Sequence, residues 1–246
     1  MATRLLFWRR EAEDAASLEE HARPGRLADF ILGSQDGLVN VLGVILGVAV
    51  ASQSLKIILA GGLAATFAES ISMGAVAYTS TIARRDHYLS EIERERREMQ
   101  EKPEVERQEV RTVFERWGFR GQELEDMTDR IVANPHAWLE FMMAHELNLA
   151  PVSRAQARVS AVIVGLAAIV GSVIPLIPFA FTGPNILLGI FASLLVSAGT
   201  LFLIGWYKGK ATIGRPARSG LQMLVIGIVS AIAGFGIAYL VSAPGG

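Results

Sequence analysis

The sequence predicts an all-α protein that crosses a membrane with five helices and carries a charged helical segment between the second and third. Two observations point to this fold class. The chain is 51% hydrophobic with a mean hydropathy of +0.37, which is too apolar for an ordinary soluble domain. Its charges are segregated: outside the first 26 residues and the segment 84–152, the acids are limited to Asp29, Asp36 and Glu69.

The first part of the chain is predicted to be a polar tail followed by two spans. Residues 1–26 lack the apolar core and small-residue cleavage site of a signal peptide, so we expect no cleaved leader. The region 27–83 then supplies two apolar runs, 27–52 and 57–83, separated by a turn at Lys56. Each run has the roughly 20 residues that a helix needs to cross the hydrocarbon core.

The segment 84–152 is polar and is predicted to form three helices outside the membrane. Pro103 suits the first turn of a helix, where its missing N–H costs nothing. Gly118 and Gly121 interrupt the next junction. We therefore expect helices over 84–101, 103–117 and 122–149, the last broken near Asn134-Pro135.

Residues 153–246 supply the remaining three spans, over 155–178, 185–207 and 217–242. Pro175 and Pro178 are expected to end or kink the first of these, because proline lacks the N–H that a helix needs. Gly183-Pro184-Asn185 predicts a tight turn into the next span.

The basic residues predict the orientation of the chain. Every Lys and Arg except Lys56 lies in 1–26, 84–158 or 208–218, which fall on one side of a five-span protein. Cytoplasmic loops carry the excess of Lys and Arg, so the N-terminus and the 84–152 segment are predicted to be cytoplasmic. Because the chain is short and shows no organellar targeting signal, we expect it in the bacterial inner membrane.

An ionisable side chain inside a span costs about 2.5–3.5 kcal/mol on insertion scales, so its presence needs a reason. Asp36 shares one helical face with Gly33, Asn40, Gly43 and Gly47. This small, polar face is expected to meet another helix, and the Gly43/Gly47 spacing suits close packing, including packing between two copies of the chain. The alternative is a carboxylate at the start of a helix, satisfied by neighbouring N–H groups.

The second span carries a carboxylate and a thioether on one face. Glu69 and Met73 are four residues apart, so their side chains point the same way. A hard oxygen beside a soft sulfur suits a borderline cation such as Fe²⁺ better than Ca²⁺ or Mg²⁺. A buried methionine alone is usually core filler, so the combination with Asp36 is what indicates a metal pathway.

Carboxylates also crowd the polar segment. Successive glutamates step by three or four residues, which places them on shared helical faces where like charges repel. A divalent cation between them would remove that repulsion. The alternative is a solvated helix with ordinary ion pairs such as Glu93–Arg97. The glutamates concerned are Glu91, Glu95, Glu98, Glu106 and Glu109.

The end of the third polar helix again mixes a carboxylate with thioethers. Met142 and Glu146 are four residues apart and share a face, and Met143 lies beside them. This combination favours a metal site over a solvated face. We expect His145 to face solvent.

Other kinds of chemistry are poorly supported. The chain has no cysteine, which excludes disulfides and thiolate metal sites. It has no phosphate-binding glycine loop, no HExxH and no nucleophile elbow, so we expect no enzyme. Its basic residues are interleaved with acids, so we expect no nucleic-acid partner.

Five stretches from Leu27 onward resemble the vacuolar iron transporter (VIT) family: GSQDGLVNVLGVILGV, ESISMGAVAY, RRDHYLSEIERERREM, KPEVERQEV and PHAWLEFMMAHELNL. The resemblance covers nearly the whole chain. The order of the stretches, and the helical insertion between spans two and three, make it specific.

The resemblance implies five-span subunits that form a homodimer in the lipid bilayer. It implies export of Fe²⁺, often also Mn²⁺ and related ions such as Co²⁺ or Zn²⁺, from the cytoplasm in exchange for protons, with no permanently bound cofactor. Asp36 and Met73 match the family's membrane pathway. The ligands of its cytoplasmic metal-binding domain match Glu95, Glu98, Glu106, Glu109, Met142 and Glu146.

One position departs from the plant-type pattern of this family, which has a glutamate two turns before the pathway methionine. Ala65 stands there in this chain, and Glu69, one turn before Met73, is a candidate substitute on the same face. The departure leaves ion selectivity and proton coupling open.

Together these observations predict an all-α polytopic membrane protein with five transmembrane helices and an inserted cytoplasmic three-helix metal-binding domain. The predicted function is export of a divalent metal ion by proton antiport. Two alternatives remain: a membrane-tethered metal sensor or buffer, and a structural membrane protein whose charged segment docks a partner.

Overall fold

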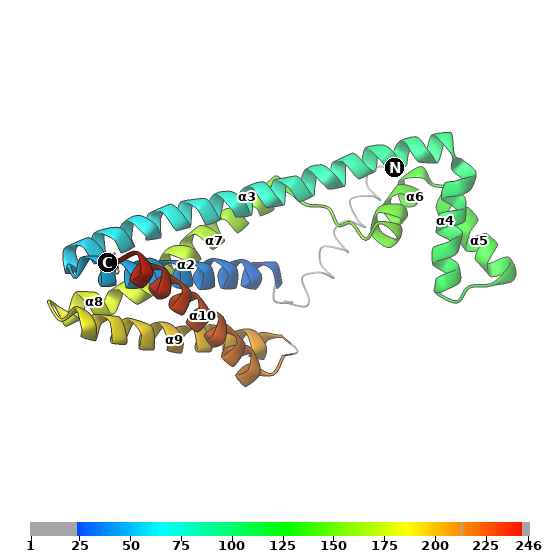
Figure 1. Cartoon of the computed structure of the whole chain (residues 1–246). Coiled ribbons are helices and arrows are strands. Elements are labelled where there is room, and N and C mark those ends of the chain that lie inside the picture. The colour runs from blue at the N-terminus through cyan, green and yellow to red at the C-terminus, as the bar shows by residue number, and fades with distance from the viewer. Residues whose placement is uncertain (1–23, 213, 243–246) are drawn as a thin grey trace, which may run out of the picture.

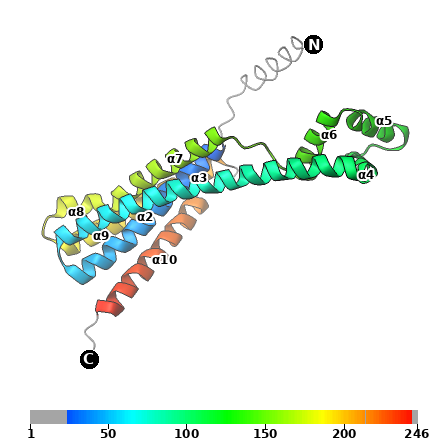
Figure 2. The same ribbon diagram turned by 90° about the horizontal axis from the view of Figure 1, so that it is seen from above.

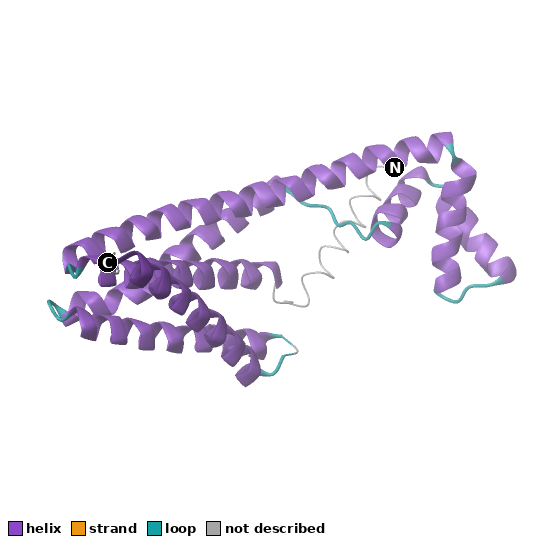
Figure 3. Cartoon of the chain, in the orientation of Figure 1, coloured by secondary structure: helices purple, strands orange, loops and turns teal. Residues whose placement is uncertain are grey.

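Long apolar runs and a few helix-breaking residues set the boundaries of the helices. The structure is a computed structural model that describes residues 24–212 and 214–242, so most of the tail predicted over 1–26 lies outside it. The described residues form helices and no strand (Figures 1 and 3). In chain order the elements are α2 (Pro24–Ser52), α3 (Leu55–Glu101), α4 (Pro103–Arg116), α5 (Gly121–Val132), α6 (Pro135–Phe141), the π-helical turn η1 (Met142–Glu146), α7 (Arg154–Val173), the 3₁₀ turn η2 (Ile174–Leu176), α8 (Ile177–Thr182), α9 (Ile186–Ala211) and α10 (Pro216–Ser242).

Five helical stretches in the described residues are long and apolar enough to cross a membrane, as predicted. Four of them belong to single helices, α2, α3, α9 and α10. The third in chain order is composite, because α7 continues through η2 into α8. Pro175 and Pro178 lie in this part and interrupt the regular helix where the sequence predicts a kink.

Helix α3 is much longer than predicted. A boundary is predicted at Arg84, but the helix runs without interruption over 47 residues, from Leu55 to Glu101. At 1.5 Å per residue its length is about 70 Å. No proline or glycine occurs between Gly74 and Pro103, and the charged residues of that interval are mostly strong helix formers. The second span and the first polar helix are therefore one rod, which extends beyond the bundle of membrane helices (Figure 1).

The remaining polar helices gather beside the far end of α3 (Figure 1). The predicted break at Asn134-Pro135 is present, and there the Asn134 side chain accepts hydrogen bonds from the backbone N–H groups of His136 and Ala137. The single helix expected over 122–149 is thus divided into α5, α6 and η1. A small apolar core joins these helices to α4; it consists of Val110, Val113, Phe114, Leu124, Trp138, Phe141 and Met142.

Ion pairs join α4 to α5 at the surface. Arg107 lies 2.8 Å from both Glu125 and Asp129, and Arg111 lies 2.8 Å from Glu125. These pairs lower the pKa of Glu125 through its hydrogen bonds with the two arginines. The acids at this surface therefore already have arginine as their counter-ion.

Helix α2 packs against α3, α7, α9 and α10 in the membrane bundle (Figure 2). Its closest approach is to α7, at Gly33 and Gly37, where an added Cβ atom would overlap backbone atoms of α7. Gly171 on α7 faces the backbone of Ser34 in the same way. The glycine pair that permits close packing within the chain is therefore Gly33/Gly37, which the sequence analysis did not single out.

The polar face of α2 is only partly covered in the single chain. The Cβ position of Gly43 has no neighbouring atom within 4 Å, although Gly234 of α10 approaches its backbone. Asn40 is exposed and Asp36 is half-buried. The packing of Gly43 and Gly47 between two copies of the chain stays a prediction.

Replacing Gly171 by alanine is expected to destabilise the protein, because the new methyl group would overlap the Ser34 carbonyl oxygen and push α2 away from α7. Overpacking of this kind costs about 1–3 kcal/mol. Gly199→Ala on α9 is the matched control, since nothing lies within 4 Å of its Cβ position. The melting temperature in detergent should fall only for Gly171→Ala. Equal melting temperatures for the two variants would contradict the close packing of α2 on α7.

Candidate metal site

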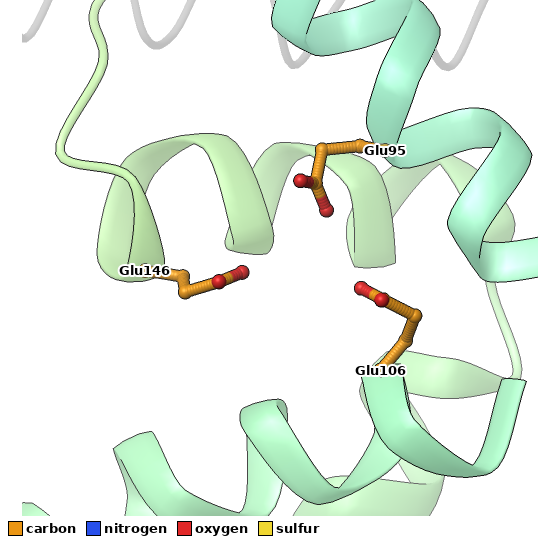
Figure 4. Close-up of side chains that lie close together, drawn as sticks. All are labelled: Glu95, Glu106 and Glu146. Atoms are coloured by element: carbon orange, nitrogen blue, oxygen red, sulfur yellow. The ribbon is translucent and has the colours of Figure 1, made fainter. Parts of the chain in front are cut away.

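Three glutamates from three different elements meet near the C-terminal end of α3. Glu95 lies on α3, Glu106 in the first turn of α4 and Glu146 at the end of η1. One carboxylate oxygen from each lies within 4.8 Å of the others, and the three side chains point toward one another (Figure 4). All three belong to the predicted set of metal ligands.

A change of chain direction at Lys102 places Glu106 opposite Glu95. The backbone of Lys102 (φ −137°, ψ 51°) is not helical, and Pro103 begins α4 directly after it. Proline is favoured there because the first N–H of a helix has no partner inside the helix. Helix α4 therefore leaves the axis of α3 within one residue and brings its first turn back toward Glu95.

A π-helical turn positions Glu146. In η1 the backbone N–H of Leu147 donates to the carbonyl oxygen of Met142, five residues earlier. Such single wide turns are rare and occur frequently at functional sites. Met142 is fully buried in the apolar core of the polar helices, so it anchors the turn from which Glu146 extends.

Glu95 and Glu106 are buried and Glu146 is half-buried, and the three carboxylates lack enough hydrogen-bond donors. Glu95 and Glu106 expose only 1% and 3% of their surface. One oxygen of each of the three, Oε2, is buried and has no hydrogen-bond partner among the described residues. Burying an ionised carboxylate without a partner is costly, so such a group tends to take up a proton or a cation.

Burial and mutual repulsion raise the pKa of all three groups. Burial first, and then the charges of Glu109 and Glu95, raise the pKa of Glu106 from 4.5 to about 8. Burial is also the main reason that the pKa of Glu146 rises to about 7. The pKa of Glu95 is raised by its burial and by the nearby charge of Glu98. In the absence of a cation, protons therefore occupy part of this site near neutral pH.

Arg94 is a resident cation at the edge of the cluster. Its guanidinium lies 3.0 Å from Glu91, 3.4 Å from Glu98 and 3.7 Å from Glu95. Its charge acts against the upward shifts in the pKa of Glu95 and Glu146 without cancelling them. The Arg94 side chain is 47% exposed, so it compensates the outer side of the cluster more than the buried oxygens.

The other predicted ligands lie around these three carboxylates. Glu98 and Glu109 are half-buried and close enough to raise the pKa of both Glu95 and Glu106. Glu91 is half-buried and pairs with Arg94. His145 is exposed, as expected, and its ring stacks edge-on against Trp117, with centroids 5.0 Å apart.

A second pair of carboxylates meets inside the membrane bundle. Glu69 on α3 interacts with Asp36 and Asn40 on α2, so the fold brings together acids from two separate spans. Met73 lies one turn after Glu69 on α3 and is half-buried. Ala65, at the position that departs from the plant-type pattern, packs against the apolar core of the bundle.

Sequence comparison with known proteins gives matches that include the residues of both carboxylate sites. The sequence model of the VIT family matches residues 27–239, which is most of the chain and includes all five membrane spans. The chain belongs to the VIT family. The resemblance seen in the sequence motifs is thereby confirmed.

This VIT-family chain resembles its relatives over nearly their whole lengths. It is 33% identical over 224 residues to vacuolar iron transporter 1 of Arabidopsis thaliana, covering 91% of this chain and 89% of the relative. It is 34% identical over 221 residues to vacuolar iron transporter 2 of Oryza sativa subsp. japonica, covering 89% of each. Vacuolar iron transporter of Plasmodium falciparum is 28% identical over 220 residues, with 85% of this chain and 80% of the relative covered.

Three features of these VIT-family sites were missed by sequence reasoning. These are the π-helical turn, the interaction of Asn40 with Glu69, and the selection of the innermost glutamates. The spacing of the glutamates along the chain does not distinguish one from another. The angle between α3 and α4 decides which of their side chains face the carboxylate cluster. One local signal of the turn exists: Asn148, with φ 53°, marks its end, since asparagine tolerates the left-handed region.

The raised pKa values predict that the metal-free protein loses stability as the pH rises. An acid whose pKa is higher in the folded state stabilises the fold below its unfolded value of 4.5, and this stabilisation is lost as the pH rises through about 7 for Glu146 and about 8 for Glu106. The melting temperature in the presence of a chelator should therefore fall between pH 6 and pH 9.

Glu106→Gln, which cannot ionise, should flatten that fall. Glu123→Gln, on the exposed surface of α5, is the control and should keep the native pH dependence. A native protein whose melting temperature is unchanged over this range would show that the buried carboxylates do not titrate there.

Proposed function

We propose that this chain exports Fe²⁺ from the cytoplasm in exchange for protons and that it works as a homodimer. The observation that carries the proposal is the convergence of three carboxylates, the buried Glu95 and Glu106 and the half-buried Glu146, outside a five-span bundle that holds a second carboxylate pair. The names of the relatives, vacuolar iron transporters, supply the metal.

The chemistry of the donors favours a divalent transition metal. Glu95, Glu106 and Glu146 offer oxygen ligands, and Glu98 and Glu109 add negative charge. Met142, which is buried in the apolar core in the same turn as Glu146, is proposed as a thioether ligand. Carboxylates with a soft sulfur nearby suit Fe²⁺, and oxygen ligands also suit Mn²⁺. We therefore propose Fe²⁺ as the main cargo and Mn²⁺ as a second one, with Co²⁺ and Zn²⁺ as convenient probes.

Helix α3 would link collection of the ion to its passage. It carries Glu95 at the polar end and Met73 in the membrane, 22 residues apart, which is about 33 Å along a helix. In this proposal the polar helices form a cytoplasmic metal-binding domain, 84–152, that raises the local concentration of the ion. The orientation rests on the segregation of Lys and Arg to one side of the membrane.

The membrane pathway would be lined by Asp36, Glu69 and Met73. The interaction of Glu69 with Asp36 and Asn40 supports Glu69 as the substitute for the glutamate missing at Ala65. A dehydrated cation between two carboxylates compensates charges that lipid disfavours. When the cation leaves, a proton can take its place on the same carboxylate, which is the coupling that an antiporter requires.

A homodimer would cover the open part of α2. Asn40 is exposed, and the Cβ position of Gly43 has free space around it, so this face can accept a second helix. Small residues at such a face allow close approach of helices in lipid. Each subunit would then contribute its own carboxylate pair to a shared pathway.

Glu106→Gln is expected to weaken metal binding at least tenfold, because it replaces a buried carboxylate, whose pKa is raised to about 8, by a neutral amide. Isothermal titration of the full-length protein with Co²⁺ measures this loss. Glu123→Gln should bind like the native protein, because Glu123 is exposed on α5. Equal affinity in Glu106→Gln and the native protein would remove the buried cluster from the proposal.

Asp36→Asn and Glu69→Gln are each expected to abolish Fe²⁺-driven proton flux in proteoliposomes while leaving Co²⁺ binding to the polar helices intact. Ser72→Ala, an exposed position on the same stretch of α3, should transport normally. Unimpaired flux in both carboxylate variants would reject the pathway. Metal binding without flux in the native protein would instead favour a membrane-tethered buffer or sensor.

A further inference from the structure

A cavity of about 770 Å³ lies apart from both carboxylate sites, where α2 begins, α3 passes and α7 begins. Its lining is mixed: apolar side chains such as Val152 and Val159 lie beside the polar residues Arg26, Asp29, Thr81, Arg84, Gln156 and Ser160. None of these residues takes part in the carboxylate cluster or in the Asp36–Glu69 pair. The cavity therefore needs an explanation of its own.

The charged groups around this cavity have no ion-pair partner among the described residues. Arg26 and Asp29 are one helical turn apart on α2, yet neither is paired with the other or with Arg84. Arg84 makes one described hydrogen bond, donating to the Thr81 hydroxyl at 3.1 Å. Ser160 also lines the cavity and is only 8% exposed. The cavity is thus lined by two guanidinium groups, one carboxylate and the hydroxyl-bearing side chain of Ser160.

The cavity lies at the level where the apolar spans give way to polar chain. Arg84 is the first residue of the charged part of α3, and α2 and α7 both begin beside the cavity. On α7 an exposed apolar strip starts at Val159 in the cavity lining and continues along one face through Val162 and Leu166. A cavity that carries charged groups and continues into an apolar strip suits an amphiphile.

We propose that this cavity binds the headgroup of an aminophospholipid, with the acyl chains lying along the Val159–Leu166 strip. The phosphate would bind to Arg26 and Arg84, because guanidinium groups hold phosphate oxygens through paired, charge-assisted hydrogen bonds. The Ser160 hydroxyl would donate a further hydrogen bond. Asp29 would bind the ammonium group, and it disfavours headgroups that carry only negative charge.

Native mass spectrometry of the delipidated full-length protein tests this proposal, with phosphatidylethanolamine, phosphatidylglycerol and phosphatidylcholine titrated in parallel. Phosphatidylethanolamine should bind most tightly. Arg84→Gln should weaken its binding roughly tenfold, the loss expected for one charge-assisted pair. Arg218→Gln, on α10 and outside the cavity lining, should have no effect. Arg26→Gln is a second variant with the same expected loss if Arg84→Gln does not fold.

The headgroup preference separates this proposal from simpler explanations. Asp29→Asn should abolish the preference for phosphatidylethanolamine over phosphatidylglycerol while retaining phosphate-dependent binding. Equal binding of all three lipids by the native protein, or equal loss in Arg84→Gln and Arg218→Gln, would overturn the proposal. Displacement of the lipid by free phosphoethanolamine at similar concentration would show that a soluble phosphate compound, and not a lipid, occupies the cavity.

Discussion

The mutual repulsion of buried carboxylates is the constraint on which the arrangement of the polar helices depends. One carboxylate oxygen from each of Glu95, Glu106 and Glu146 lies within 4.8 Å of the others. Each of these residues also has one buried oxygen without a hydrogen-bond partner among the described residues. An apolar core that includes Phe114 and Met142 holds the helices together despite this repulsion. The fold therefore stores an unfavourable electrostatic interaction that a proton or a cation can relieve.

Carboxylates in an unfavourable environment occur in the membrane bundle as well as in the polar helices. Inside the bundle, Glu69 and Asp36 also lie side by side, and lipid makes their charges still less favourable. Helix α3 carries one carboxylate of each site, so a single rigid element joins the polar helices to the membrane pair. Membership of the VIT family fits a chain built in this way, and in our proposal Glu69, one turn further along α3, takes the place of the glutamate missing at Ala65.

The membrane part of the fold was largely predictable, because its signals are local. Apolar runs predicted the five spans, and Pro175 and Pro178 marked the interruption in the third span. Outside the spans, Asn134-Pro135 marked the break between α5 and α6. The change in composition at Arg84 predicts a helix boundary, but α3 continues through it because no helix-breaking residue is present. Gly33/Gly37 and the π-helical turn depend on how helices pack on one another, so the spacing of residues along the chain does not reveal them. For the same reason the sequence predicts the larger set of candidate glutamates, but it does not predict that Glu95, Glu106 and Glu146 are the three that meet.

Proton release on metal binding tests most directly whether the buried carboxylates exchange protons for a cation. Isothermal titration of the full-length protein with Co²⁺ at pH 7, in two buffers with different ionisation enthalpies, gives the number of protons released per ion. Because Glu106 and Glu146 have pKa values of about 8 and about 7, binding should release about one proton or more per ion at pH 7 and fewer at pH 9. Binding at pH 7 with no proton release would contradict the exchange of proton for metal at this site.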